Sequence, residues 1–165
     1  MSVQQSEGSL TPAPSLPPGE FADFYRQEFS RAVQLAWLLT HGHNSEDLAQ
    51  DAFISVQIKY RQLDNPSAYL TTAVVNRCRT WHRQQQRRRQ QLSVVPPQSA
   101  SRDPVDDYLL DAIGALPYRQ RVVVIGRYWA DLSEVDIARI LGCRPGTVKS
   151  LASRALVRLR KEVER

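Results

Sequence analysis

The chain has few of the residue types that cross-link a protein or anchor it in a membrane. Among 165 residues, only Cys78 and Cys143 are cysteines, and their spacing fits neither a disulfide framework nor a metal-ligand pair. No apolar run reaches the length of a transmembrane helix, and the first residues lack the basic and apolar segments of a secretory signal. We therefore expect a cytoplasmic protein with reduced thiols and no membrane insertion.

The sequence also lacks the residue sets that carry out catalysis. It shows no nucleophile beside a base, no glycine-rich loop that would cradle a phosphate and no cluster of carboxylates. A metal site is conceivable at His41-Gly42-His43, because Glu46 and Asp47 follow, but histidines of a surface turn are the simpler interpretation. We predict that the protein is not an enzyme and has no catalytic residue, cofactor or metal.

Strand patterns are missing, and the apolar residues recur at helical spacing from Phe21 onward. The β-prone run at residues 122–125 lies between a helix-starting proline, Pro117, and a helix-turn-helix pattern. The sequence therefore predicts an all-α fold. We expect a disordered tail (residues 1–19), a helical domain (20–91), a flexible linker (92–105) and a second helical domain (106–165).

Charge of both signs is unevenly distributed along the chain. No acid occurs from Asn65 to Arg102, where seven arginines lie, and residues 137–165 carry eight basic residues against two acids. A charge run is most often a solvated surface, but here both basic segments coincide with predicted helices. Because clustered arginine favours phosphate, this pattern indicates a nucleic-acid partner.

Residues 132–150 predict two helices joined by a tight turn. Ser133 and Asp136 have the spacing of a helix-capping pair, and Gly142 suits the left-handed conformation that ends a helix. Ala138 is small where the two helices must cross closely. This pattern is typical of a DNA-binding helix-turn-helix, although a hairpin that packs on another protein has the same outline.

The second helix of this pair has a packing side and an open side. Val148, Ala152, Ala155, Leu156 and Leu159 are expected inside. On the other side we expect Ser150, Ser153 and Arg154 to reach base edges, with Arg154 suited to guanine. Phosphate contacts are predicted at the helix start and along its flanks, from Arg144, Thr147, Lys149 and Arg158.

The first domain carries two further polar strips. In the helix from Ser45 to about Tyr60, a narrow strip opposite the apolar face predicts a protein contact, made by Asp47, Gln50, Ile54 and Gln57. In the helix from Ala68 to about Gln91, a polar and then basic strip predicts contact with a nucleic-acid strand through Thr72, Asn76, Arg79 and Arg83. The preceding loop suits an unstacked base, held by Asn65, Ser67 and Tyr69.

These segments resemble the sigma factors of bacterial RNA polymerase, and within the sigma-70 family the small extracytoplasmic-function (ECF) group. The first domain carries the resemblance in EDLAQDAF (46–53), NPSAYL (65–70) and VNR (75–77). The second carries it in LPYRQR (116–121), YWADLS (128–133), IA (137–138) and RAL (154–156). The resemblance covers about residues 20–163, with the tail and the linker unmatched.

The resemblance implies roles for the strips. The first domain is similar to sigma region 2, so its Asp47–Gln57 strip would dock on the clamp helices of the largest polymerase subunit. The strip with Asn76, and the loop before it, would melt and capture the −10 promoter element. The second domain is similar to sigma region 4 and would read the −35 element as duplex. The group's usual partner is an anti-sigma factor.

Three residues depart from the family pattern. Arg144 stands where a serine is common, so a side-chain helix cap is lost. Leu151 stands where a basic residue is common, and it is either core or a contact to a thymine methyl. Gly126 interrupts a helix at a cost of about 1 kcal/mol relative to alanine. The alternative to a sigma factor is a helix-turn-helix regulator that acts without core polymerase, which would leave the strips of the first domain unused.

Overall fold

The computed structural model describes residues 19–91 and 104–164, and it describes side chains from residue 108 onward in the second segment. The predicted tail up to residue 18 and the predicted linker at residues 92–103 lie outside the described residues. Within the described part, seven α-helices and one short 3-10 helix account for the regular structure, with no strand. The predicted all-α fold is confirmed.

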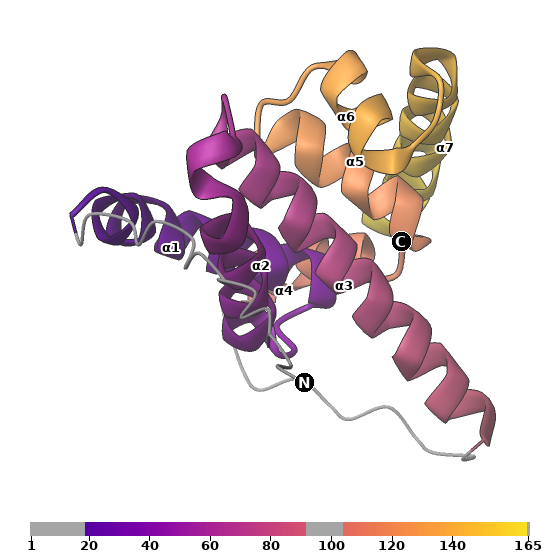
Figure 1. Cartoon of the computed structure of the whole chain (residues 1–165). Helices are drawn as coiled ribbons and strands as arrows, with labels where there is room; N and C mark the ends of the chain where they lie inside the picture. The colour runs from indigo at the N-terminus through magenta and orange to yellow at the C-terminus, as the bar shows by residue number, and fades with distance from the viewer. Residues whose placement is uncertain (1–18, 92–103, 165) are drawn as a thin grey trace, which may run out of the picture.

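Three helices form an N-terminal bundle: α1 (Glu20–Thr40), α2 (Ser45–Lys59) and α3 (Pro66–Gln91), with the 3-10 turn Tyr60–Gln62 after α2 (Figure 1). Each pair of these helices is in contact. Phe53 of α2 packs between aromatic rings of α1, with its centroid 4.6 Å from that of Tyr25 and 5.9 Å from that of Phe24. The apolar spacing in the sequence therefore fixes which face of each helix turns inward.

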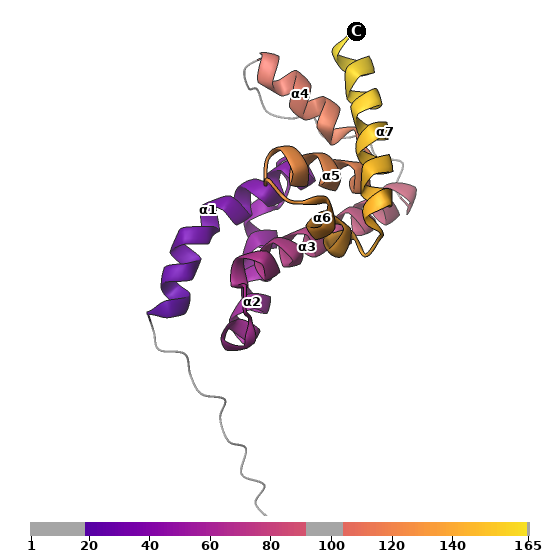
Figure 2. The ribbon, with the colours of Figure 1, turned by 90° about the horizontal axis from the view of Figure 1, so that it is seen from above.

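Four helices form a C-terminal bundle: α4 (Pro104–Gly114), α5 (Tyr118–Tyr128), α6 (Glu134–Leu141) and α7 (Pro145–Val163). In Figure 2, α5 lies between α1 of the N-terminal bundle and α7, and it contacts α1, α3, α6 and α7. The β-prone residues 122–125 are helical and buried in α5. Tertiary burial on several sides outweighs their strand propensity.

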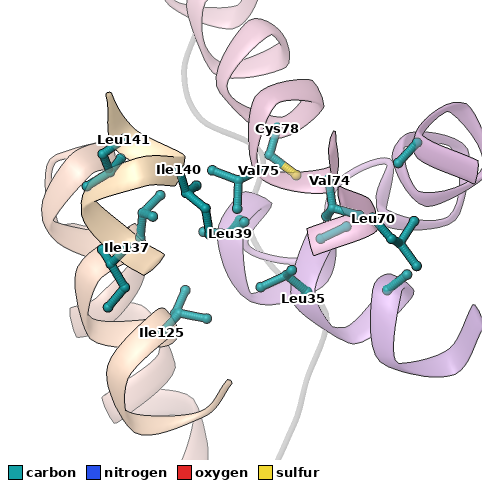
Figure 3. Packing of buried hydrophobic residues seen from close by; sticks show 14 of the residues in the cluster. Leu35, Leu39, Leu70, Val74, Val75, Cys78, Ile125, Ile137, Ile140 and Leu141 are labelled. Atoms are coloured by element: carbon teal, nitrogen blue, oxygen red, sulfur yellow. The ribbon is translucent and has the colours of Figure 1, made fainter. Parts of the chain in front are cut away.

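The two bundles share one apolar core (Figure 3). Leu39 of α1, Val75 and Cys78 of α3, and Ile140 of α6 belong to the same cluster of buried residues. Cys78 is fully buried, as its position on an apolar helix face indicates, and burial raises the pKa of its thiol to about 12. The sequence predicts two domains joined by a flexible linker, and the structure adds that their helices pack directly against each other.

Polar contacts also join the bundles. The Tyr118 hydroxyl of α5 donates to the Val75 carbonyl of α3 at 2.6 Å. The Arg121 guanidinium donates to the Leu39 carbonyl at the end of α1, also at 2.6 Å. Arg79 of α3 donates to the Ile140 carbonyl in the last turn of α6 at 3.4 Å. In each of these bonds, a side chain of one bundle donates to a backbone carbonyl of the other. The bonds therefore fix how the two bundles are oriented relative to each other.

The starts of α2 and α3 each show a local feature that the sequence does not predict. The third helix begins at Pro66 rather than Ala68. Asparagine is a residue type that commonly caps helices, but Asn44 before α2 makes no side-chain cap, because its backbone is left-handed (φ 52°) and not extended. Its carbonyl instead accepts from the Leu48 amide at 3.0 Å.

Gly126 has a packing role that the sequence does not reveal. A Cβ at this position would lie 3.2 Å from Cγ1 and 3.3 Å from Cδ1 of Ile137. Ile137 belongs to α6 and is almost fully buried. The glycine therefore allows α5 and α6 to approach closely. This close approach explains why α5 contains a glycine, although glycine has a low helix propensity.

Candidate interfaces with nucleic acid and polymerase

The turn between α6 and α7 has the geometry that the sequence predicts. The Ser133 hydroxyl accepts from the Asp136 amide at 3.1 Å, and Gly142 is left-handed with φ 61°. The Cys143 amide donates to the Ala138 carbonyl at 2.9 Å and so closes the end of α6. Arg144 precedes α7 and makes no side-chain cap, as expected from the missing serine. The turn therefore sets α7 at a fixed angle to α6.

One side of α7 is packed and the other is open. Leu151 is buried together with Val148, Ala152 and Ala155, so it is core and not a surface contact. Leu156 was expected inside but is 40% exposed. The exposed residues of the predicted DNA face are Arg144, Lys149, Ser150, Ser153, Arg154 and Arg158, whereas Thr147 is half-buried.

Two residues of this face already have intramolecular partners. The Ser150 hydroxyl donates to the Gly146 carbonyl at 3.2 Å. The Lys149 ammonium lies 3.8 Å from a carboxylate oxygen of Glu134. Ser153 and Arg154 are exposed on α7. The strongest candidate for base contact on this helix is therefore Arg154, whose guanidinium can donate two parallel hydrogen bonds.

The predicted protein-contact strip lies on the open face of α2. Asp47, Gln50, Ile54 and Gln57 are all exposed, while Leu48, Ala49, Ala52, Phe53 and Val56 are buried. Ile54 is 55% exposed, and Ile58, one turn further, is 75% exposed. Sequence reasoning missed Ile58, although its i, i+4 relation to Ile54 places it on the same side. Two neighbouring exposed isoleucines make this an apolar patch with a polar rim.

The predicted −10 residues of α3 and its preceding loop are brought to one region, but their side chains differ in availability. Asn76 and Asn65 are exposed, and the Asn65 side chain also accepts from the Ala68 amide at 3.0 Å, which caps the start of α3. Tyr69 is half-buried, with the Lys59 ammonium 5.8 Å from its ring centroid.

The remaining hydroxyls of this region have intramolecular partners. The Ser67 hydroxyl donates to Glu28 at 2.9 Å, and the Thr72 hydroxyl donates to the Ala68 carbonyl at 3.2 Å. Both Arg79 and Arg83 border a cleft of about 380 Å³ between α3 and the C-terminal bundle. Arg79 is half-buried there by its bond to Ile140, whereas Arg83 is exposed. The N-terminal half of the strip is therefore open and the basic half faces the other bundle.

His41 and His43 each contact a neighbouring side chain. His41 Nε2 lies 3.0 Å from a carboxylate oxygen of Asp111, and His43 stacks on Trp81 with a centroid distance of 5.8 Å. Among the residues with described side chains, no group of three His, Cys, Asp or Glu is placed to hold a metal ion. None of the described helices is long and apolar enough to cross a membrane.

Family patterns match both bundles. Sigma-70 region 2 matches residues 24–88, and Sigma-70, region 4 matches residues 106–159. The chain is 31% identical over 157 residues to the RNA polymerase sigma-E factor of Streptomyces coelicolor, which covers 87% of this chain and 86% of the relative. The RNA polymerase sigma-E factor of Streptomyces avermitilis is 32% identical over 158 residues, covering 88% and 86%.

Solved structures have the same arrangement of helices. The sigma factor RpoE of Bartonella quintana, in complex with the anti-sigma factor NepR, superposes with a TM-score of 0.74 at 27% identity and covers 87% of this chain and 96% of that chain. CnrH in complex with the cytosolic domain of CnrY gives a TM-score of 0.63 at 18% identity, covering 87% of each chain, a likeness of fold alone.

The chain belongs to the sigma-70 family of bacterial RNA polymerase sigma factors, in its ECF group. It is a transcription initiation factor that binds core RNA polymerase and promoter DNA. The match of both regions in one chain favours this function over a helix-turn-helix regulator that acts without polymerase.

Proposed function

We propose that the chain directs core polymerase to a subset of promoters through three separate surfaces. The α2 strip (Asp47, Gln50, Ile54, Gln57, here extended by Ile58) docks on the clamp helices of the largest polymerase subunit. The α3 strip and its preceding loop capture the −10 element. The α7 face reads the −35 element. The observation that carries the proposal is that Ile54 and Arg154 are each exposed beside fully buried neighbours, one in each bundle.

The α7 face supports duplex recognition. Ala152 and Ala155 are buried in the core, whereas Ser153 and Arg154 are exposed on the side of α7 that faces away from it. An exposed arginine and small hydroxyl side chains on a helix of this kind match the donor and acceptor pattern of a major groove. Arg144, Lys149 and Arg158 flank them and supply phosphate contacts that orient the helix.

Strand capture by α3 requires the bundles to move apart. Asn65, Tyr69 and Asn76 lie at or near the surface, where they suit an unstacked base. Arg79, however, donates to the Ile140 carbonyl of α6, so its guanidinium must leave that acceptor before it binds a phosphate. The described arrangement is therefore a closed form, and initiation needs an open one.

The remaining parts of the proposal follow from family membership. An anti-sigma factor is a further partner, since the Bartonella quintana relative is seen in such a complex. The protein acts in the cytoplasm, where the bacterial polymerase and its DNA are found. It contributes no catalytic residue, and promoter melting draws on binding free energy.

Paired variants separate the surfaces. Asp47→Asn is compared with Glu46→Gln, its exposed neighbour, for co-purification with core polymerase. Arg154→Gln is compared with Arg160→Gln, exposed further along α7, for binding of the assembled complex to −35 duplex. We expect Asp47→Asn alone to weaken core binding and Arg154→Gln alone to weaken DNA binding, by about tenfold or more. Equal behaviour within either pair contradicts the assignment of that surface.

A further inference from the structure

A cleft of about 540 Å³ lies where the two bundles meet. Its walls come from the end of α1, from α3, from the end of α4 and from the start of α5, and all three histidines of the chain line it. This volume is within the range of small-molecule sites, and such sites occur preferentially at boundaries between domains. We call it the interbundle cleft. None of the residues that line the cleft belongs to the three predicted surfaces, although α3 contributes residues to both the cleft and the −10 surface.

Two buried donors at the interbundle cleft have no acceptor. The indole Nε1 of Trp81 and the guanidinium Nε of Arg121 are both fully covered and make no hydrogen bond. Arg121 is 6% exposed, and both residues line the cleft. An indole and a guanidinium can only donate, so a group that satisfies them must be an acceptor. Leaving a buried donor unpaired costs about 1–3 kcal/mol.

The charge of the lining has the sign that suits an anion. Arg89 and Arg121 are its two permanent charges of positive sign, and Gln85 and Gln86 add amide donors. The acid of the lining, Asp111, already lies 3.0 Å from His41 Nε2. Among lining residues this leaves an excess of positive charge.

The carbonyl ends of the helices at the cleft carry partial negative charge, which opposes the binding of an anion. They therefore determine where in the cleft an anion can sit. The carbonyls of Leu39, Gly114 and Leu116 accept from the Nη atoms of Arg121, so the negative ends of α1 and α4 offset part of its charge. Arg89 makes no such contact and is exposed at the rim. The main ionic partner in the cleft is therefore Arg89, and the covered Trp81 Nε1 is a donor that an occupant reaches only after a local shift.

We propose that the interbundle cleft binds a small molecule that carries a phosphate or carboxylate group. Its oxyanion pairs with Arg89, and it accepts from Trp81 Nε1 once the side chains that cover this atom shift aside. Because α1, α3, α4 and α5 all contribute to the walls, an occupant stabilises the closed form in which the bundles touch. Binding itself does not depend on the promoter surfaces proposed above.

The test is a titration of the full chain, followed by nuclear magnetic resonance of the indole N–H groups. The chain has three tryptophans, and the spectrum of Trp81→Phe assigns the Trp81 signal. Inorganic phosphate and citrate are the two probes, with chloride at equal ionic strength as the control. We expect the Trp81 signal to shift with saturation in at least one probe. A response to one probe alone identifies the oxyanion class, and a response to both shows that the cleft accepts either class.

Matched arginines make the result specific. Arg89→Gln removes the rim charge, while Arg88→Gln removes an equal charge from the neighbouring exposed position of α3, which does not line the cleft. We expect Arg89→Gln to raise the dissociation constant about tenfold and Arg88→Gln to leave it unchanged. The bound probe should also raise the unfolding temperature of the wild type more than that of Arg89→Gln. If neither probe shifts the Trp81 signal, or if both variants bind alike, the cleft holds water only and the proposal is wrong.

Discussion

The guanidinium of Arg121 on α5 donates to the carbonyl oxygen of Leu39 in the last turn of α1, at 2.6 Å. The same guanidinium donates to the carbonyls of Gly114, at the end of α4, and Leu116. A single buried side chain thus satisfies the ends of two helices from different bundles. Burial lowers the pKa of Arg121 from its usual value. The three carbonyl acceptors stabilise the charged guanidinium by hydrogen bonds.

We expect Arg121→Lys to lower the free energy of unfolding by about 1–3 kcal/mol. An ammonium is a compact charge that cannot reach three carbonyls in the geometry of the planar guanidinium, so at least one buried acceptor loses its donor. Urea unfolding of the full chain measures the change. The control is Arg119→Lys, at an exposed position of the same helix, and equal stability of the two variants would show that the carbonyl contacts contribute nothing.

Stability should fall as the pH drops below about 6.5, the ordinary pKa of histidine, because of His82. Burial lowers the pKa of His82 in the folded chain, nearby Arg121, Arg89 and His43 act in the same direction, and the hydrogen bond to the Leu39 carbonyl opposes them. The unfolded chain therefore binds a proton before the folded chain does, so stability that is present above pH 6.5 is lost as the pH falls towards the folded pKa.

The variant His82→Gln isolates this effect, since an amide can still donate to Leu39 but does not titrate. We expect a smaller loss of unfolding free energy between pH 7.5 and 5.5 in the variant than in the wild type. The remaining pH dependence belongs to other titratable groups of the chain. A loss of the same size in both proteins would rule out His82 as its source.

The two cysteines should differ sharply in reactivity. The Cys78 thiol is fully buried in the shared core, and burial raises its pKa to about 12, so the reactive thiolate is scarce. Cys143 lies partly exposed after the turn glycine of the helix-turn-helix. A thiol reagent at neutral pH should modify Cys143 in the native chain and Cys78 only after unfolding. Rapid modification of both thiols would mean that the bundles separate readily.

Gly126→Ala should destabilise the protein by about 1 kcal/mol despite its gain in helix propensity. The new Cβ would approach Ile137 at 3.2 Å, and Ile137 has little room to shift because it is itself almost fully buried. Overpacking of this kind costs about 1–3 kcal/mol, against a propensity gain of about 1 kcal/mol. Thermal unfolding decides the sign, and a stabilised variant would show that α6 moves freely relative to α5.

The helices and the turn of this fold are predictable from the sequence because local rules govern them. Helical periodicity identifies the buried faces, and Ser133 and Gly142 mark the ends of α6 by their own backbone chemistry. Of the predicted site residues, Arg154 and Ile54 are exposed because their neighbours at helical spacing are apolar.

The contact between the bundles is not predictable in the same way. Periodicity shows that Leu39 and Val75 are buried but not what covers them, and Tyr118 and Arg121 look like surface residues until their distant acceptors are known. Arg79 shows the same limit, since its basic strip predicts a nucleic-acid contact while its guanidinium here meets α6. Gly126 likewise gains its explanation only from the approach of Ile137.

The central claim is that one chain holds a surface for core polymerase and two separate surfaces for promoter DNA. It is tested most directly by transcription in vitro from genomic templates, with purified core polymerase and the full chain, followed by mapping of start sites. We expect defined start sites that need the chain, that are lost with Arg154→Gln and that persist with Arg160→Gln. Absence of chain-dependent start sites, or an unchanged set with Arg154→Gln, would contradict the account.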